Sequence, residues 1–293
     1  MDVTYFVATW DKTGAGFGTG DSISRKLPDS FRDKVSLSFQ TRDFFSSRYP
    51  NTFDRLNQSS KITTEECIDF FCTPFVEVCD EDEFEARYEA CRGLRVGGNL
   101  NQAKMYYGIH AAIEMKKKFE ADNQMRFDAV IRSRPDLTVQ SIGLTDIRIA
   151  TAHNTILSTH LRINAFGDIF LVMSTEVADI IGAMWPAIEN AKSFAIVPGA
   201  SGAAAETALF ETLCWNGVRL LQLRDSRVLS LNSVAIVSDT FWESLKSDLL
   251  AVKCHAIREF DQVDVSIASA ASEAAGEGQI ADLTTLFQRM GAE

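Results

Sequence analysis

The chain carries the stretch Phe127-Asp-Ala-Val-Ile-Arg-Ser-Arg-Pro-Asp-Leu137, in which an apolar run ends in two arginines and a carboxylate. The apolar run predicts a buried strand. Arg132, Arg134 and Asp136 then alternate, so an extended backbone places all three side chains on one side. Pro135 favours this geometry, because the residue before a proline is pushed out of the helical region. The pattern predicts a phosphate site at a strand end, with a structural ion pair as the plainer alternative.

A long helix is predicted before this strand. Asn99 or Asn101 is a suitable N-cap, and apolar residues recur at near-heptad spacing from Met105 to Phe119, so we expect the helix to end near Asn123. A helix that feeds a strand is typical of α/β proteins. We therefore expect an α/β fold with a parallel or mixed sheet.

Other segments carry local signals of the same kind. Val3 to Thr9 is rich in β-branched and aromatic residues, which indicates a buried strand that ends at Trp10. Ser174 or Thr175 is expected to cap a helix that bends or restarts near Pro186. The remaining predicted elements are one or two strands in Ile147–Leu157, a strand over Gly167–Met173, a helix over Glu206–Trp215 that stops at Asn216-Gly217, and a strand over Val218–Leu223.

The bulk composition narrows the function classes. A formal net charge of -11 and a pI near 4.9 argue against a nucleic-acid partner, which favours a broad basic surface. No apolar run approaches the roughly 18 residues of a membrane span. The six cysteines form no Cys-x-x-Cys pair, which favours reduced thiols. We therefore expect a cytoplasmic protein that meets a membrane only at its surface, if at all.

The sequence predicts one domain over residues 1–265. The glycine-rich segment Gly14–Gly20 lacks the third glycine of a dinucleotide fingerprint, so it predicts an active-site or surface loop. Residues 266–293 predict a flexible linker and a short amphipathic C-terminal helix. Because that helix has an apolar face of its own, a homodimer is plausible.

Five motifs, taken in order, resemble a group of bacterial, viral and plant glycosyltransferases with a GT-A-like fold. The resemblance implies a Rossmann-type mixed, mostly parallel sheet flanked by helices. The resemblance covers residues 2–10 and 97–225, and the Arg-x-Arg-Pro-Asp string is its most specific part. The motifs are Asp2–Trp10, Asn99–Tyr107, Phe127–Asp136, Gly167–Phe170 and Ala205–Leu209.

The resemblance implies transfer of a sugar from a nucleotide-sugar donor to a glycan or lipid-linked acceptor, as in polysaccharide biosynthesis. In this group an Asp-x-Asp motif holds a divalent cation against the donor diphosphate, and Arg134-Pro-Asp136 looks like its local version. A guanidinium can neutralise part of the diphosphate charge in place of the metal. Asp136 remains a candidate ligand for Mn²⁺ or Mg²⁺, and metal dependence stays open.

The resemblance also assigns candidate site residues. It implies that Glu206 is the general base on the acceptor hydroxyl, with Asp168 as the competing acid. Glu206 is equally suited to capping a helix, Tyr106 to a core, and Trp10 to closing a sheet edge. The donor-binding candidates are Trp10, Asp11, Gln102, Tyr106, Arg132, Arg134 and Asp136.

One departure from the group leaves a second function open. Relatives open with an additional strand that contributes to the nucleotide pocket. Here either the chain is naturally short, or another segment, such as Ser233–Ser238, replaces that strand. A non-catalytic sugar- or nucleotide-binding protein on a degenerate scaffold is therefore the main alternative. A metal-dependent hydrolase is disfavoured, because the four histidines lack the spacing of a metal site.

Overall fold

A computed structural model describes residues 2–13, 27, 29–57, 60–92, 100–134, 137–152, 154–162, 165–191, 196, 205–230, 239–254, 267, 269 and 271. The chain divides into two compact units, Met1–Thr13 with Lys61–Ser230 and Gly14–Ser60 with Leu231–Glu293. We call them the sheet unit and the helical unit. This division differs from the single domain that we expected over residues 1–265, because residues 14–60 and 231–293 belong to one unit.

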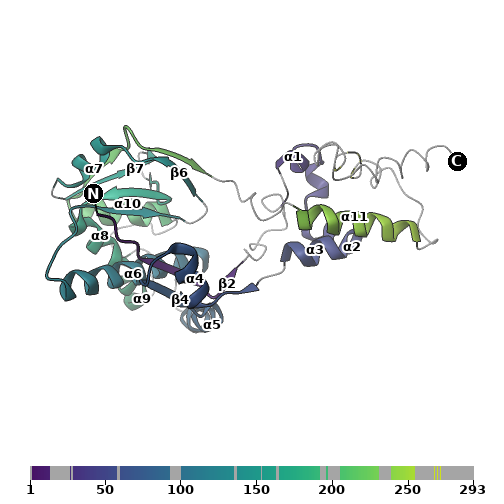
Figure 1. Cartoon of the computed structure of the whole chain (residues 1–293), viewed down its shortest axis with the longest axis horizontal. Helices are drawn as coiled ribbons and strands as arrows, with labels where there is room; N and C mark the ends of the chain where they lie inside the picture. The colour runs from purple at the N-terminus through teal and green to yellow at the C-terminus, as the bar shows by residue number, and fades with distance from the viewer. Residues whose placement is uncertain are drawn as a thin grey trace. The chain divides into compact units, whose positions relative to one another are not determined.

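The sheet unit is a mixed α/β structure, as the sequence predicted (Figure 1). Its elements before the first long helix are β1 (Val7–Trp10), β2 (Lys12–Thr13), α4 (Thr64–Phe71), β4 (Val76–Cys79) and α5 (Glu81–Arg92). Next come α6 (Leu100–Asp122), β5 (Val130–Ser133), β6 (Leu137–Ser141), α7 (Leu144–Ala150), β7 (Thr155–Ser158), β8 (Leu161–Arg162) and β9 (Ala165–Phe166). The last are β10 (Phe170–Met173), α8 (Thr175–Gly182), α9 (Met184–Ala191), α10 (Ala205–Trp215), β11 (Arg219–Gln222) and β12 (Arg227–Ser230).

Four strands form the central sheet, in the order β11-β7-β10-β5. β10 is antiparallel to both β5 and β7, whereas β11 is parallel to β7. Consequently β5, β7 and β11 run in the same direction and their carboxyl ends lie at one edge. Phe170, the first residue of β10, lies opposite Ser133, the last residue of β5. We call this side of the sheet the carboxyl edge.

β1 and β4 form a separate parallel pair whose orientation is fixed by aromatic rings. Phe6 precedes β1, Phe75 precedes β4 and Phe127 precedes β5, and Phe119 lies near the end of α6. Phe6 lies 5.3 to 5.8 Å from the other three rings. The amino ends of β1, β4 and β5 therefore meet near the end of α6, and their carboxyl ends point towards its beginning.

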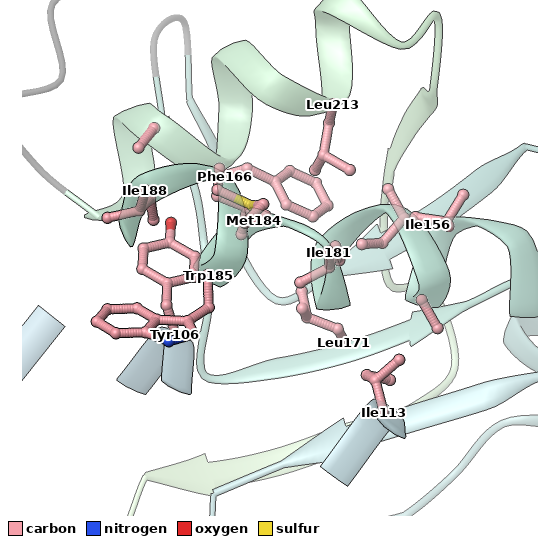
Figure 2. Packing of buried hydrophobic residues seen from close by; sticks show 14 of the residues in the cluster. Tyr106, Ile113, Ile156, Phe166, Leu171, Ile181, Met184, Trp185, Ile188 and Leu213 are labelled. Atoms are coloured by element: carbon pink, nitrogen blue, oxygen red, sulfur yellow. The ribbon is translucent and has the colours of Figure 1, made fainter. Parts of the chain in front are cut away.

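Helices cover the central sheet on both faces. On one face α6, α8, α9 and α10 bury a core that includes Ile156 and Leu171, and Figure 2 shows side chains of these helices and of β7, β9 and β10 converging there. On the other face α7, β6 and β12 cover Leu157, Phe170 and Val172. Neighbouring residues of β7 and β10 therefore enter opposite cores, as alternation in a strand requires.

The connection from α6 to β5 is held by a buried carboxylate. Glu120 is 5% exposed and accepts hydrogen bonds from Phe127 N (3.0 Å) and Thr175 Oγ1 (3.1 Å). Its second oxygen lies 3.2 Å from Lys116 Nζ, which also bonds to Asp179. A buried ion pair is favourable only when its remaining hydrogen bonds are satisfied, as they are here. These contacts fix the start of the chain segment that leads into β5.

Most predicted elements appear near their expected positions. α6 corresponds to the helix that was predicted to end near Asn123. The Ser174 side chain caps α8. The helix restarts at Met184, two residues before Pro186. Gly217 ends α10 with a φ of 64°, which favours glycine. The strands predicted over Ile147–Leu157 are only partly correct, because its first residues belong to α7.

Replacement of glycine by alanine should change the stability in opposite directions at Gly182 and at Gly108. A Cβ on Gly182 would lie 2.5 Å from Ile113 Cγ2, whereas a Cβ on Gly108 would meet nothing within 4 Å. Gly182→Ala should therefore destabilise the fold by about 1–3 kcal/mol, because α8 must move away from α6. Gly108→Ala should stabilise it by about 0.5–1 kcal/mol, since alanine is the better helix former. Urea unfolding measures both, and equal effects of the two substitutions would contradict this packing.

The turn between β11 and β12 is organised by a second buried carboxylate. Asp146 is 0% exposed and accepts hydrogen bonds from the backbone N–H groups of Arg224 (2.9 Å), Asp225 (3.1 Å) and Ser226 (2.8 Å). Burial raises the pKa of Asp146, but the hydrogen bonds, led by that of Arg224, outweigh burial and leave the pKa below its usual value. The folded protein thus favours the charged form.

We expect this carboxylate to make stability depend on pH. Because the folded pKa is lowered, its contribution is fully present above the unfolded pKa of about 3.9 and is lost as the pH falls through the folded value. Asp146→Asn turns an amide towards three N–H donors, so it should cost about 1–3 kcal/mol at pH 7. Urea midpoints should then differ most at pH 7 and converge below about pH 4. A difference that grows on acidification would refute the assignment.

The helical unit consists of α1 (Asp29–Arg32), η2 (Leu37–Phe39), α2 (Arg42–Arg48), α3 (Pro50–Asn57) and α11 (Asp239–Cys254), and β3 (Ser60–Lys61) follows α3 in the sequence. α11 lies along α3 (Figure 1). Asp248 of α11 is 2% exposed and accepts hydrogen bonds from the backbone N–H groups of Asn51 and Thr52 at the start of α3. The carboxylate therefore caps α3 from another helix.

Two further predictions concern membrane-spanning helices and the state of the cysteines. In the part of the chain that the structure describes, no helix has the length and apolar character needed to cross a membrane. Cys67, Cys72, Cys79 and Cys214 are free thiols. Burial raises the pKa of Cys79 to about 11, so this thiol stays protonated at neutral pH. The loop Gly14–Gly20, the strand candidate Ser233–Ser238 and the C-terminal helix lie outside the described residues.

Candidate functional site

The sequence-predicted arginines lie at the carboxyl edge. Arg132 belongs to β5, and Arg134 N donates a hydrogen bond of 3.3 Å to Ile169 O. This bond continues the β5–β10 pairing beyond Ser133, so the backbone stays extended through Arg134. Arg132 and Arg134 therefore share the face of the strand on which Val130 packs against the helix-covered core. Arg132 is half-buried, Arg134 is exposed, and Asp136 lies outside the described residues.

Asp168 lies at the same edge, two residues before β10 begins. It lies beside Ile169, whose carbonyl accepts the hydrogen bond from Arg134. The preceding Gly167 is held to the end of β7, because its carbonyl accepts a hydrogen bond of 2.7 Å from Ser158 Oγ. A Cβ on Gly167 would lie 2.9 Å from the same Ser158 oxygen, so the close approach requires glycine. We call Arg132, Arg134 and Asp168 the strand-end cluster.

Tyr106 lies behind the strand-end cluster. Its side chain is 1% exposed, and it forms a hydrogen bond with the backbone of Leu209 in α10. Burial and the charge of Asp168 raise the pKa of Tyr106, against the smaller opposing effects of Arg132 and the Leu209 bond. The phenol therefore stays neutral. Tyr106 therefore lies in the core, which is the alternative that the sequence left open beside a donor contact.

Two other candidates flank the cluster. Glu206 lies in the first turn of α10 and is exposed, one turn before Leu209. α10 packs against β9, the strand that leads directly into Gly167 and Asp168. Gln102 is half-buried on α6, one turn before Tyr106 and on the same side of the helix. Both acids proposed for the reaction thus belong to segments that meet at the carboxyl edge.

Trp10 has other partners. Its ring lies 5.0 Å from Phe84 and stacks on Tyr107 at 5.6 Å, and Lys104 Nζ lies 5.8 Å from its centroid. These contacts show Trp10 half-buried and packed against aromatic rings of the sheet unit. This packing agrees with the alternative that Trp10 closes a sheet edge.

The Asp11 carboxylate also has a structural role. Its carboxylate accepts a hydrogen bond of 3.0 Å from Glu81 N, at the start of α5, and lies 3.6 Å from Lys61 Nζ. A carboxylate at a helix N-terminus satisfies an otherwise unpaired donor and complements the helix dipole. Asp11 therefore caps α5, a role that the sequence analysis did not foresee.

Two positioning residues were missed by the sequence analysis. Lys104 is paired with Glu81 and Glu85 and lies over Trp10. Ser158 anchors Gly167. The signal for Ser158 was present, since it ends the apolar run Thr155–Leu157 in the way that Arg132 ends its own. No local sequence pattern indicated Lys104, because its acidic partners Glu81 and Glu85 belong to another helix, α5.

The described residues fit an anion better than a cation. The strand-end cluster combines two guanidinium groups with one carboxylate, and guanidinium groups bind phosphate oxygens in a forked geometry. Nowhere in the described ranges do three His, Cys, Asp or Glu side chains gather as they would around a metal ion. The cluster alone therefore does not make a divalent-cation site, and we assign no chemical step to a metal.

The strand-end cluster places two positive groups at the carboxyl edge. In open α/β sheets ligands bind outside the carboxyl ends of the strands, and here three strands end at that edge. The arginines offer charge neutralisation, and the exposed Glu206 in the first turn of α10 offers a proton acceptor. The chain matches no protein-family model, no curated protein and no solved structure.

Proposed function

We propose that this chain is a glycosyltransferase that moves a sugar from a nucleotide-sugar donor to a glycan or lipid-linked acceptor. The observation that carries the proposal is the meeting of Arg132, Arg134 and Asp168 at the carboxyl edge, beside the helix that bears Glu206. These are segments that the sequence resemblance singled out, and they are more than 30 residues apart in the chain. The GT-A-like arrangement of the sheet is part of the proposal.

The reaction needs a base and an anion site. In an inverting transfer the acceptor hydroxyl oxygen forms a bond to the anomeric carbon, and the bond from that carbon to the diphosphate oxygen breaks. The acceptor proton passes to the Glu206 carboxylate. The leaving nucleoside diphosphate keeps the bonding electron pair, and Arg132 and Arg134 neutralise the charge that develops on it. Asp168 then orients the acceptor through its hydroxyl groups.

A non-catalytic binding protein is the second candidate. Trp10 and Asp11, expected to line a nucleotide pocket, are instead engaged in packing and in capping α5. A protein that binds the anion but does not turn over the donor would not need Trp10 and Asp11 in a nucleotide pocket. Such a protein binds the donor or its diphosphate product without consuming it, so donor turnover separates the two candidates.

The test is a panel of nucleotide sugars, with and without Mn²⁺, scored for thermal stabilisation and for hydrolysis of the donor. We expect at least one donor to raise the melting temperature and to be slowly hydrolysed, because water can replace the acceptor. Stabilisation without hydrolysis or transfer supports the binding protein. A well-folded sample that responds to no donor rules out both.

A further inference from the structure

The chain forms a β-bulge at the carboxyl edge, between the end of β7 and the start of β10. Ser158 of β7 lies opposite Leu171 of β10, whereas the N–H of Gly167 donates a hydrogen bond of 2.9 Å to His160 O. Two steps along the first strand, from 158 to 160, therefore correspond to four steps along the second, from 167 to 171. The additional residues lie in the segment 168–170, which we call the Asp168 bulge. Bulges re-aim side chains and are common beside active sites.

One buried hydroxyl holds the base of the Asp168 bulge. Ser158 is 0% exposed, and its Oγ donates a hydrogen bond of 2.7 Å to Gly167 O and accepts one of 3.3 Å from His160 N. The hydroxyl thus satisfies a backbone group on each strand at the point where the regular β7–β10 pairing stops. A Cβ on Gly167 would lie 2.9 Å from the same oxygen, so the two strands approach closely here.

The backbone on both sides of Asp168 is fixed by hydrogen bonds. Gly167, the residue before it, is bonded to Ser158. Ile169, the residue after it, accepts the hydrogen bond of 3.3 Å from Arg134 N. The Asp168 bulge therefore connects the end of β7 to the end of β5, and Asp168 lies between the two attachments.

We propose that Ser158 is a positioning residue, which holds the Asp168 bulge in place beside Arg134 for recognition of the acceptor. The inference rests on the proposed function, in which Asp168 orients the acceptor and Arg134 binds the donor diphosphate. Without the Ser158 hydroxyl, Gly167 O and His160 N lose this partner and the bulge can shift. A displacement of about 1 Å can cost about 100-fold in rate. Donor binding should change little, because β5 keeps its pairing with β10.

Ser174 provides a matched control at the opposite edge of the same two strands. It follows β10 and is 2% exposed, and its N–H donates a hydrogen bond of 3.0 Å to Thr155 O at the start of β7. Its hydroxyl accepts a hydrogen bond of 3.4 Å from Val177 N. Ser158→Ala and Ser174→Ala each remove one buried, bonded hydroxyl, so they should lower the melting temperature by similar amounts. Only Ser158→Ala disturbs the Asp168 bulge.

Gly167→Ala disturbs the same contact from the other strand. Its methyl group would press on Ser158 Oγ, so we expect the same loss of acceptor recognition. Ser158→Ala removes the oxygen that this methyl group meets. The loss in the double variant should therefore be smaller than the sum of the two single losses, expressed as free energies. Additive losses would contradict a shared contact.

The experiment combines steady-state kinetics with amide hydrogen exchange on the full chain. For Ser158→Ala we expect kcat/KM for the acceptor to fall about 10- to 100-fold and the Kd of the donor to change less than about twofold. Amide exchange in residues 165–170 should accelerate. Ser174→Ala should leave both constants and the exchange of this segment at wild-type values, and should accelerate exchange at the start of α8.

Three results for Ser158→Ala overturn the inference. They are a wild-type kcat/KM for the acceptor, an equal loss of donor affinity, and wild-type exchange in residues 165–170. If the wild type turns over no donor, the proposed function fails. The exchange readout then still decides whether the Ser158 hydroxyl holds the Asp168 bulge.

Discussion

Replacing Arg134 by alanine is expected to weaken donor binding by about 10- to 100-fold while leaving the fold intact. Hydrogen bonds to charged groups contribute about 1.5–3 kcal/mol, and a forked guanidinium makes two of them to a diphosphate. Arg134 is exposed, so its loss should change the free energy of unfolding by no more than about 0.5 kcal/mol. Isothermal titration with the best donor of the panel measures the effect.

Two further variants serve as controls, one that separates geometry from charge at Arg134 and one that removes an arginine elsewhere. Arg134→Lys keeps the charge but loses the forked geometry, so we expect an intermediate affinity. Arg148→Ala removes an exposed arginine from α7, which covers the opposite face of the sheet, and should leave the affinity unchanged. Unchanged affinity in Arg134→Ala would move the anion site away from the strand-end cluster.

Glu206→Gln is expected to lower transfer to the acceptor by about 100- to 10,000-fold while the donor still binds. The amide keeps the size of the side chain but cannot take the proton of the acceptor hydroxyl, and general bases contribute about this factor. Because Glu206 does not touch the diphosphate in the proposed reaction, the Kd of the donor should be unchanged. Transfer of a labelled sugar, measured beside donor binding, tests both halves.

The matched control is Glu176→Gln. Glu176 is also an exposed acid in the first turn of a helix, α8, so both substitutions remove about 0.3–1 kcal/mol of helix-dipole stabilisation. Only Glu206 should affect transfer. Near-normal transfer by Glu206→Gln would eliminate it as the base and make Asp168 the candidate, to be tested by Asp168→Asn.

Sequence patterns predicted the parts of the fold that depend on local chemistry. The cap at Ser174 and the glycine stop at Gly217 lie where predicted, because both act within one helical turn. Alternation along Arg132 and Arg134 placed both on one face, since strand geometry alone sets that periodicity. The meeting of this strand end with Gly167-Asp168 was suggested by the resemblance, and the antiparallel pairing of β10 with β5 supplies its physical basis.

The features that were missed depend on partners far apart in the sequence. Asp248 of α11 holds α3 through a hydrogen bond from Thr52 N, and the two residues are 196 positions apart. The local sequence of either helix therefore does not indicate its partner. The strand β4 was not predicted, because Glu77 interrupts its apolar residues and its partner strand β1 lies far away in the sequence. Asp11 was assigned to a ligand because its capping of α5 requires the β1–β4 pairing to bring Glu81 near. In each case tertiary contacts decide the role.

The central claim is that a nucleotide sugar binds at the strand-end cluster and is consumed there. Release of nucleoside diphosphate from each donor, compared between the wild type and Arg134→Ala, tests it most directly. We predict release above background from at least one donor by the wild type, and loss of that release in the folded variant. Absence of release from every donor, or equal release by the two proteins, would contradict the claim.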